Sequence, residues 1–456
     1  MCSNNIRSAV LALCGLAVFA GLVACTEDAS QFPDGPPAVD AAIDAVPACV
    51  APIGAGTMHG GSVNAAETWT EAGSPHVLPF DTSVYAAVTI EACAVVRIAV
   101  GKTITIQPGG GLIATGATGR PVTIEAVVPG MAWASIRTLG GDLSLTHTIV
   151  RGGGAPLATV PAFTGVLYIQ GTAATGTFHV DDVEIADSQS QGVYIPGDRG
   201  FDAASRDLRV HGSASFPVHV YARVIGSIPT GVYTGNGRDA IAIAGTGGPV
   251  LDAQTMRVRG VPYHVGSGTD GGRMDVNSQV NGTVAVLTIE PGVTIQFPPG
   301  GTLNVEPAGG TLAAHGALIA IGTAVQPIVF TSDQGVAAAA GDWLGVGFGG
   351  QVDPQSVMQH VRVEFAGGPG TGSNSCPYPG RVGQNDAGIR IFGPTLTQFI
   401  TSTAIVASAR DGIDRGWRAD LQPDFLATNT FTDVAGCDQT TPRTQAGVCP
   451  PTPPCP

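Results

Sequence analysis

The chain has 456 residues and a formal net charge of −14, and only 12% of its residues are charged while 44% are hydrophobic. This balance excludes a disordered chain, and the acidic charge excludes nucleic acid as an electrostatic partner. The 65 glycines beside 6% aromatic residues are typical of many short strands separated by tight turns.

The N-terminus reads as an export signal. A short segment that contains Arg7 is followed by an apolar run over residues 9–24, which is short for a bilayer span. The run ends in "LVAC", Leu22 to Cys25, which resembles the bacterial lipobox. The resemblance implies that residues 1–24 are a lipoprotein signal peptide and that the Cys25 thiol is lipidated. An ordinary secretory signal or a marginal membrane helix is the alternative.

The segment after the signal favours a surface address. Thr26 provides no inner-membrane retention signal, so we expect attachment to the outer membrane or the cell surface. Residues 25–48 are rich in Pro, Ala and Asp and show no strand or helix periodicity. They predict a tether that spaces the folded part from the membrane.

The cysteine count indicates disulfides. An even number of cysteines remains outside the signal and the lipidation site, which in an extracytoplasmic chain predicts disulfide bonds between Cys49, Cys93, Cys376, Cys437, Cys449 and Cys455. Cys49 and Cys93 are the two near the N-terminus and are expected to pair, while the other four permit three pairings. No close Cys-x-x-Cys or Cys/His spacing is present, so we expect neither a metal site nor a cofactor.

Between the tether and the C-terminal tail the chain repeats itself. The matching segments are 67–77 with 254–265, 96–112 with 287–303, 112–126 with 318–332, and 183–193 with 403–413. The repeat predicts two tandem modules, module 1 at 49–250 and module 2 at 251–436, followed by a Cys/Pro-rich cap or tail at 437–456. The offset increases by about 15 residues between the second and third pairs, which is close to one additional coil of a solenoid.

Within each module the strands are short and alternate apolar with polar residues. The segment 287–301, "LTIEPGVTIQFPPGG", shows the pattern, with Leu287, Ile289, Val293 and Ile295 on the apolar face. Pro-Gly and Gly-Gly turns separate the strands, and no segment has a helical period. The repeat and the turns together predict an all-β parallel β-helix, a solenoid built from the two modules.

One part of module 2 carries a family resemblance. Residues 310–332, followed by "GDWLGVGF" at 341–348, resemble the repeat pattern of right-handed parallel β-helix proteins of the pectin-lyase-like superfamily. More narrowly, they resemble repeat-bearing surface lipoproteins of bacteria such as myxobacteria. The resemblance implies a right-handed β-helix, but this fold hosts lyases, hydrolases, adhesins and inert surface proteins, so it does not decide activity.

The best acidic cluster lies at residues 179–187, where Asp181, Asp182 and Asp187 accompany His179. Clustered carboxylates of this kind could imitate a polygalacturonase, with one general acid and others that activate water. The internal repeat argues against this role, since the counterparts in module 2 are Phe399, Thr401, Ser402 and Ala407. The alternative is a solvated loop or a cation contact.

Other candidate groups recur in both modules. The pairs Asp198–Arg199 and Asp414–Arg415 could supply the carboxylate and the base of a lyase, or could be ion pairs that brace a corner. The remaining matches are His147 with His360, Trp133 with Trp343, and Phe201 with Trp417. The aromatic residues could stack on sugar rings or pack in the core. Glu290 is matched with Ala99, which excludes a shared chemical role.

The sequence therefore predicts a lipid-anchored extracytoplasmic β-helix with a structural or adhesive cell-surface role and no catalysis. Its expected partners are the membrane, through the anchor, and glycans or other surface proteins. The alternative is a polysaccharide-active lyase or hydrolase, or a glycan-binding module without turnover.

Overall fold

The computed structural model describes residues 47–156, 165–172, 175–245, 248–266, 271–280, 282–306, 315–349, 351–370, 386–392, 395, 397–415, 423–442 and 455. The signal segment, Cys25 and nearly all of the tether lie outside the described residues, as do Cys376, Cys449 and Trp417. Residues 48–456 form one compact unit that contains every strand given below. Among the described residues, we find no helix with the length and apolarity needed to cross a membrane.

Two sheets follow the N-terminal half of this unit. Sheet A contains β1 (Thr57–Met58), β3 (Glu67–Trp69), β4 (His76–Leu78), β6 (Ala87–Glu91), β7 (Val95–Ile98), β9 (Gly111–Thr115), β10 (Val122–Ala126), β12 (Asp142–Arg151), β14 (Phe178–Ala186), β16 (Arg206–His211) and β18 (Gly231–Val232). Sheet B begins with β2 (Ser62–Val63), β5 (Thr82–Val84), β8 (Ile104–Ile106), β11 (Ile136–Leu139), β13 (Gly165–Gln170), β15 (Gln191–Ile195), β17 (Val218–Val220) and β19 (Ile241–Ile243).

Sheet B continues through the C-terminal half, where two new sheets flank it. Its further strands are β21 (Tyr263–Val265), β24 (Thr294–Phe297), β27 (Ile328–Ser332), β30 (Val361–Glu364), β33 (Ala404–Val406) and β35 (Thr430–Thr432). Sheet C contains β20 (Ala253–Met256), β23 (Ala285–Ile289), β26 (Gly316–Ile321), β29 (Val357–Gln359) and β32 (Ile400–Thr401). Sheet D contains β22 (Arg273–Val276), β25 (Thr302–Val305), β28 (Gly345–Phe348), β31 (Ala387–Ile391) and β34 (Asp411–Arg415).

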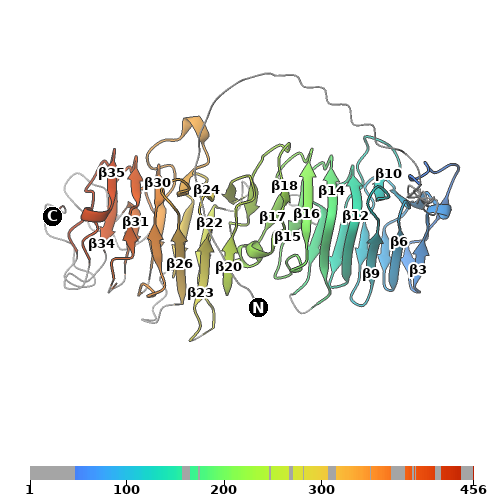
Figure 1. The fold of residues 1–456 in the computed structure, drawn as a ribbon, viewed down its shortest axis with the longest axis horizontal. Coiled ribbons are helices and arrows are strands. Elements are labelled where there is room, and N and C mark those ends of the chain that lie inside the picture. Colours follow the sequence, from blue (N-terminus) through green and yellow to red (C-terminus); the bar gives the residue numbers. More distant parts are fainter. Residues whose placement is uncertain are drawn as a thin grey trace, which may run out of the picture. The chain divides into compact units, whose positions relative to one another are not determined.

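Short 3-10 helices interrupt the strands in the described part of the chain: η1 (Glu71–Gly73), η2 (Ala222–Ser227), η3 (Gly335–Ala337) and η4 (Leu426–Thr428). Each strand pairs in parallel with the equivalent strands of the preceding and following coils, and Figure 1 shows them side by side from β3 in blue to β34 and β35 in red. The predicted all-β parallel β-helix is therefore confirmed.

The core forms because alternate residues of each strand face the inside of the coil. One inward column runs through four coils, from Val88 to Leu112, Leu143 and Phe178, and all four side chains are buried. In module 2 the residues picked out by their alternation, such as Leu287 and Ile295, are likewise buried. One coil cannot cover its own apolar face, so stacking supplies the hydrophobic stabilisation.

The corners between strands need residues with positive φ. At one corner of module 1, His147 (φ 43°), Asp182 (φ 52°) and Asp207 (φ 54°) come in register on successive coils. At the next corner Asp187 (φ 57°) precedes Gly212 (φ 68°) on the following coil. Asp, Asn, His and Gly tolerate this left-handed conformation better than other residues, which accounts for acidic residues at these positions without a catalytic role.

The two modules are not stacked in phase. In module 1 a coil places its first and second strands in sheet A and its third in sheet B, whereas in module 2 the order is sheet C, sheet B and sheet D. The third strand β19 of module 1 pairs directly with the second strand β21 of module 2. Sheet B is therefore continuous, but the repeat is shifted by one face of the coil where the modules meet.

The order of the strands within each coil shows that two predictions made from the internal repeat were wrong: the extra coil in module 2 and the counterpart of Glu290. The additional residues of module 2 lie between β21 and β23 and between β25 and β26, not in an extra coil, since β20 to β25 match β3 to β8 strand for strand. Both β6 and β23 are first strands, so Glu91 at the end of β6, and not Ala99, is the counterpart of Glu290. The match of 96–112 with 287–303 was wrong because adjacent coils resemble each other.

Two disulfides connect cysteines within the described residues. Cys49 pairs with Cys93, as expected, and ties the N-terminal stretch to the turn between β6 and β7. Cys437 pairs with Cys455, which selects one of the pairings that the sequence left open. These bonds connect the chain near the first and last coils, where the edges of the sheets would otherwise be exposed.

Candidate functional site

The predicted acidic cluster lies along β14, and its members are held apart by ion pairs. Asp182 accepts a hydrogen bond from Arg209 Nη1 at 2.8 Å, and its second oxygen lies 2.7 Å from His147 Nδ1. The bond from Arg209, together with that from His147, lowers the pKa of Asp182. Asp181 pairs instead with Arg206 at 2.6 Å. A carboxyl group whose pKa is lowered, as that of Asp182 is, makes a poor general acid.

His179 does not join this cluster. Its Nδ1 lies 3.0 Å from Asp202 Oδ1, on the loop that precedes β16. Burial alone would raise the pKa of Asp202, but hydrogen bonds from His179, Ser205 and the Ala204 backbone lower it. Asp187 is exposed at the far end of β14. The four residues predicted as one cluster are thus divided among separate contacts.

Asp198 and Arg199 do not pair with each other. Asp198 binds Arg223 of η2. Arg199 is only 3% exposed and donates through Nη1 to Gly141 O at 2.7 Å and through Nη2 to Thr177 O. Burial lowers the pKa of Arg199. Arg199 therefore braces the loops at the end of two coils and is not presented to a substrate.

Asp414 and Arg415 do not occupy the coil position of Asp198 and Arg199. They are the last two residues of β34, whereas Asp198 and Arg199 follow the end of β15, the equivalent strand of module 1. Both are buried, and each is hydrogen-bonded to Thr440. The predicted equivalence of the two pairs is wrong. Among the described residues, no group of His, Cys, Asp and Glu could hold a metal ion.

The matched tryptophans serve the core. Trp133 and Trp343 are fully buried, and each indole N–H donates to the carbonyl at the end of the adjacent strand, Arg151 O at 2.9 Å and Glu364 O at 2.7 Å. Phe201 is also buried. Packing, and not sugar stacking, is the role of these three residues.

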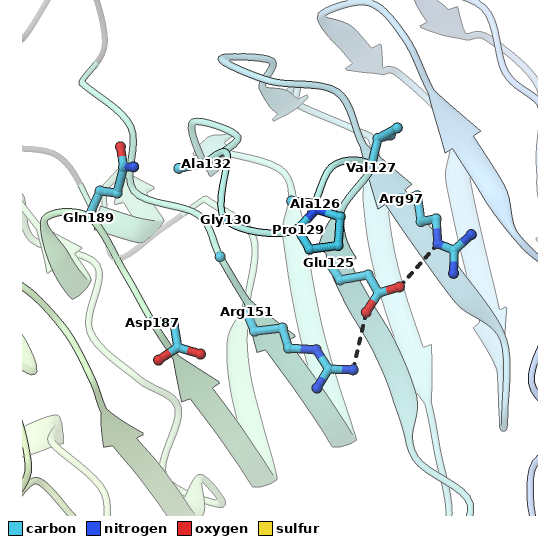
Figure 2. Close-up of a pocket in the computed structure, with 11 residues that line it drawn as sticks. Arg97, Glu125, Ala126, Val127, Pro129, Gly130, Ala132, Arg151, Asp187 and Gln189 are labelled. Carbon is cyan, nitrogen blue, oxygen red and sulfur yellow. Dashed lines mark hydrogen bonds and ion pairs between the residues drawn. The ribbon is translucent and has the colours of Figure 1, made fainter.

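The structure contains a groove that the repeat did not indicate. A cavity of about 720 Å³ opens where the loop between β10 and β11 stands beside the ends of β10, β12 and β14. This volume is within the usual range for small-ligand sites. Its charged residues are Arg97, Glu125, Arg151 and Asp187, and Figure 2 shows them along the ends of successive strands.

Glu125 forms the centre of this charged row. Arg97 Nε donates to Glu125 Oε1 at 3.0 Å, and Arg151 Nη2 donates to Glu125 Oε2 at 3.1 Å (Figure 2). The strand register produces the row, because Arg97 is opposite Glu125 in the pairing of β7 with β10. Both Glu125 oxygens accept from arginine, so this carboxylate positions the guanidinium groups and is a poor nucleophile.

The loop over the groove is held in place from below. Val127 N donates to Ile98 O, and Met131 N donates to Val128 O across a turn with Pro129 and Gly130 at its centre. Gly130 has φ 81°, the value that the third position of a type II turn requires. The exposed fractions of Val127, Val128 and Met131 are 39%, 43% and 51%. The loop thus presents an apolar lip beside two arginines.

Sequence reasoning missed this groove because its charged residues come from four coils. Arg97 and Glu125 are 28 residues apart, and Glu125 and Arg151 are 26 apart. To place these residues at one corner, the pairing register of each strand with the next coil would have to be known. The sequence indicated only that each side chain points outward from its strand.

Comparison of the chain with family models, with curated proteins and with solved structures finds no match.

Proposed function

We propose that the protein is a lipid-anchored extracytoplasmic β-helix with a structural or adhesive role at the cell surface, which recognises a partner through the groove beside Glu125 and catalyses no reaction. One observation carries the proposal: Asp181, Asp182 and Asp198 are each engaged by an arginine at different places on the coils, and the buried Asp414 accepts from the Thr440 hydroxyl, so these carboxylates do not converge on one site. A hydrolase needs two carboxyl groups that converge on one bond, with one protonated.

The proposed location outside the cytoplasm is supported mainly by the N-terminal sequence. The lipobox-like "LVAC" segment supports lipidation of Cys25, and two disulfides support an oxidising compartment. The resemblance to pectin-lyase-like surface proteins supports display of a β-helix outside the cell. In this arrangement residues 25–48 serve as the tether.

A polysaccharide-active enzyme is the second candidate, favoured by the presence of Glu125 and Asp187 on the same groove. Both Glu125 oxygens already accept from arginine and Asp187 is exposed at the end of another strand, so the groove does not present two free carboxyl groups that converge on one bond.

Incubation of the purified full chain with uronate and neutral polysaccharides separates the two candidates. We expect no release of unsaturated or reducing ends. Their release, if it is lost in Glu125→Gln or Asp187→Asn, would establish the enzyme instead.

Metabolic labelling with a palmitate analogue tests the anchor. We expect label on the wild-type chain and none on Cys25→Ala. Equal labelling of both chains would contradict the lipid attachment at Cys25.

A further inference from the structure

The groove is a feature of module 1 that the same coil positions of module 2 do not reproduce. The counterparts of Arg97, Glu125, Arg151 and Asp187, taken strand by strand, are Gln296, Thr331, Glu364 and Ala407. The scaffold residues of the same corner do recur, as Trp133 and Trp343. Two coils can therefore be built alike without the charged row, so the row is not needed for folding of the corner.

The space itself also differs between the modules. Gly152 lines the groove with φ 69°, and the residue at the equivalent corner of module 2 is Phe365, with φ 60°. A Cβ atom at Gly152 would meet only the Ala126 methyl group, at 3.7 Å, which is ordinary contact. The absence of a side chain at Gly152 keeps the groove open beside Arg151.

Arg97 and Arg151 lie on either side of Glu125 at the floor of the groove, while the second carboxylate of the lining, Asp187, is exposed at the end of a further strand (Figure 2). Two guanidinium groups share one carboxylate, and each arginine has N–H donors beyond the one that Glu125 accepts. Among the described residues, the hydrogen bonds of the Arg97 and Arg151 side chains go to Glu125, and both side chains reach solvent, with exposed fractions of 35% and 50%. These remaining N–H donors can form charge-assisted hydrogen bonds with an anionic group.

The uncharged residues that line the groove indicate what kind of molecule carries the anionic group. It is mainly apolar, from Ala126, Val127, Pro129 and Ala132, and Gln189 contributes one amide. None of the described lining residues is aromatic. A sugar ring would find no aromatic surface to stack on in this lining. An aliphatic chain does not need one.

From this lining we propose that the groove binds a polypeptide segment that presents a carboxylate beside aliphatic side chains, such as a chain terminus. The carboxylate lies against Arg97 and Arg151, and the aliphatic side chains lie against the lip at Val127 and Pro129. This inference rests on the proposed recognition role and names the class of partner.

The test measures binding of a short fluorescein-labelled peptide of alanine, valine and leucine to the purified full chain in detergent. We expect the free C-terminal carboxylate to bind on the order of tenfold more tightly than the C-terminal amide, as for a charge-assisted hydrogen bond. Arg97→Gln combined with Arg151→Gln should remove this preference, whereas Glu125→Gln should strengthen binding because it releases both guanidinium groups.

Two further variants provide the controls. Gly152→Phe copies the corner of module 2 and should abolish binding, with the β-sheet circular dichroism spectrum unchanged. Arg362→Gln removes a guanidinium group from β30 of module 2, where it pairs with Glu364, and should leave binding unchanged.

Equal binding of acid and amide, or binding unaffected by both Gly152→Phe and the double arginine variant, would overturn the inference. Binding of tri-galacturonate in place of the peptide, with the same sensitivity to the arginines, would overturn it in favour of a glycan. Either result leaves the proposed non-catalytic role standing if polysaccharides are not cleaved, whereas cleavage overturns that role whatever the peptide does.

Discussion

Trp133 in module 1 and Trp343 in module 2 occupy the same place in their coils, yet the surfaces around them differ. Each indole donates to the last carbonyl of the adjacent strand, at 2.9 Å and 2.7 Å. Behind them Gly154 and Gly367 both have a left-handed φ, of 83° and 80°, where a Cβ atom would collide with a serine Oγ at 2.2 Å and 2.4 Å. The interior of the corner is thus the same in both modules.

The outer surface of this corner differs between the two modules. Module 1 carries the row of Arg97, Glu125 and Arg151 and leaves an open groove, while module 2 places Phe365 at the equivalent of Gly152. This difference indicates that close packing constrains the inward residues of a repeated coil. The outward residues are not constrained in this way, so they can differ in role between the two modules.

The largest expected effect tests whether the two interiors are equivalent. Trp133→Ala and Trp343→Ala each remove a fully buried ring and should each lower the free energy of unfolding by about 3–5 kcal/mol. Urea denaturation followed by circular dichroism measures both. If one variant loses less than about half as much free energy of unfolding as the other, the two corners are packed differently.

The second prediction compares the ends of the solenoid. The Cys49–Cys93 bond closes 44 residues and the Cys437–Cys455 bond closes 18. Loop-closure entropy predicts a stabilisation of about 4 kcal/mol for the longer loop and about 3 kcal/mol for the shorter. Cys93→Ser should therefore lower the thermal midpoint more than Cys455→Ser does.

Cys93→Gly provides a control for the first bond. Cys93 has φ 65°, and the residue at the same turn of module 2 is Gly292, with φ 85°. The glycine variant should be about 1 kcal/mol more stable than Cys93→Ser, because it removes left-handed strain. Identical stability of the two variants would contradict the equivalence of the turns.

The third prediction concerns two asparagines that join neighbouring coils. Asn236 accepts from Ser213 N at 3.1 Å and donates to Val210 O at 3.0 Å. Asn429, which is only 9% exposed, accepts from Thr403 N at 2.9 Å and donates to the carbonyl groups of Ile400 and of Phe425, the residue before η4. Deletion of a buried partner leaves unsatisfied groups that cost about 1–3 kcal/mol.

We therefore expect Asn429→Ala to fall in the upper part of this range and Asn236→Ala, which is closer to solvent, in the lower part. Hydrogen exchange at Thr403 N and Ser213 N reports each loss locally. A larger effect at Asn236 would show that its side-chain bond to Asp239, from Asn236 Nδ2 to Asp239 Oδ1 at 3.5 Å, dominates.

The smallest effect is a pH dependence confined to the first coils. His59 Nε2 and His76 Nδ1 lie 3.0 Å apart, with Glu67 3.4 Å from the other His59 nitrogen and Thr70 O beside the other His76 nitrogen. Burial lowers the pKa of both histidines, and the neighbouring His76 lowers that of His59 further.

A folded-state pKa below the ordinary value of 6.5 means that the unfolded chain binds more protons. Stability from this pair is complete above pH 6.5 and is lost as the pH falls below it. Hydrogen exchange in β1 and β4, corrected for intrinsic rates, should show opening at pH 5.5 that His59→Gln removes. Equal opening of β35 would mean that the effect is not local.

Much of the fold could be predicted because its causes are local. Alternation in residues 287–297, glycine at the turns and the internal repeat require strands that stack, and the Cys49–Cys93 pair followed from its position in the chain. The sequence grouped Asp182 and Asp187 in one acidic cluster, whereas in the structure each lies at a left-handed corner, whose place depends on where the strand ends.

The sequence by itself therefore determined the inward residues, since a hydrophobic period of two specifies which face of each strand is buried. The tertiary structure alone decided which outward residues meet. That depends on the register between coils separated by loops of unequal length, and this register matches Glu290 with Glu91 and brings Arg97, Glu125 and Arg151 together. It also decided that β19 pairs with β21, which shifts module 2 by one face of the coil.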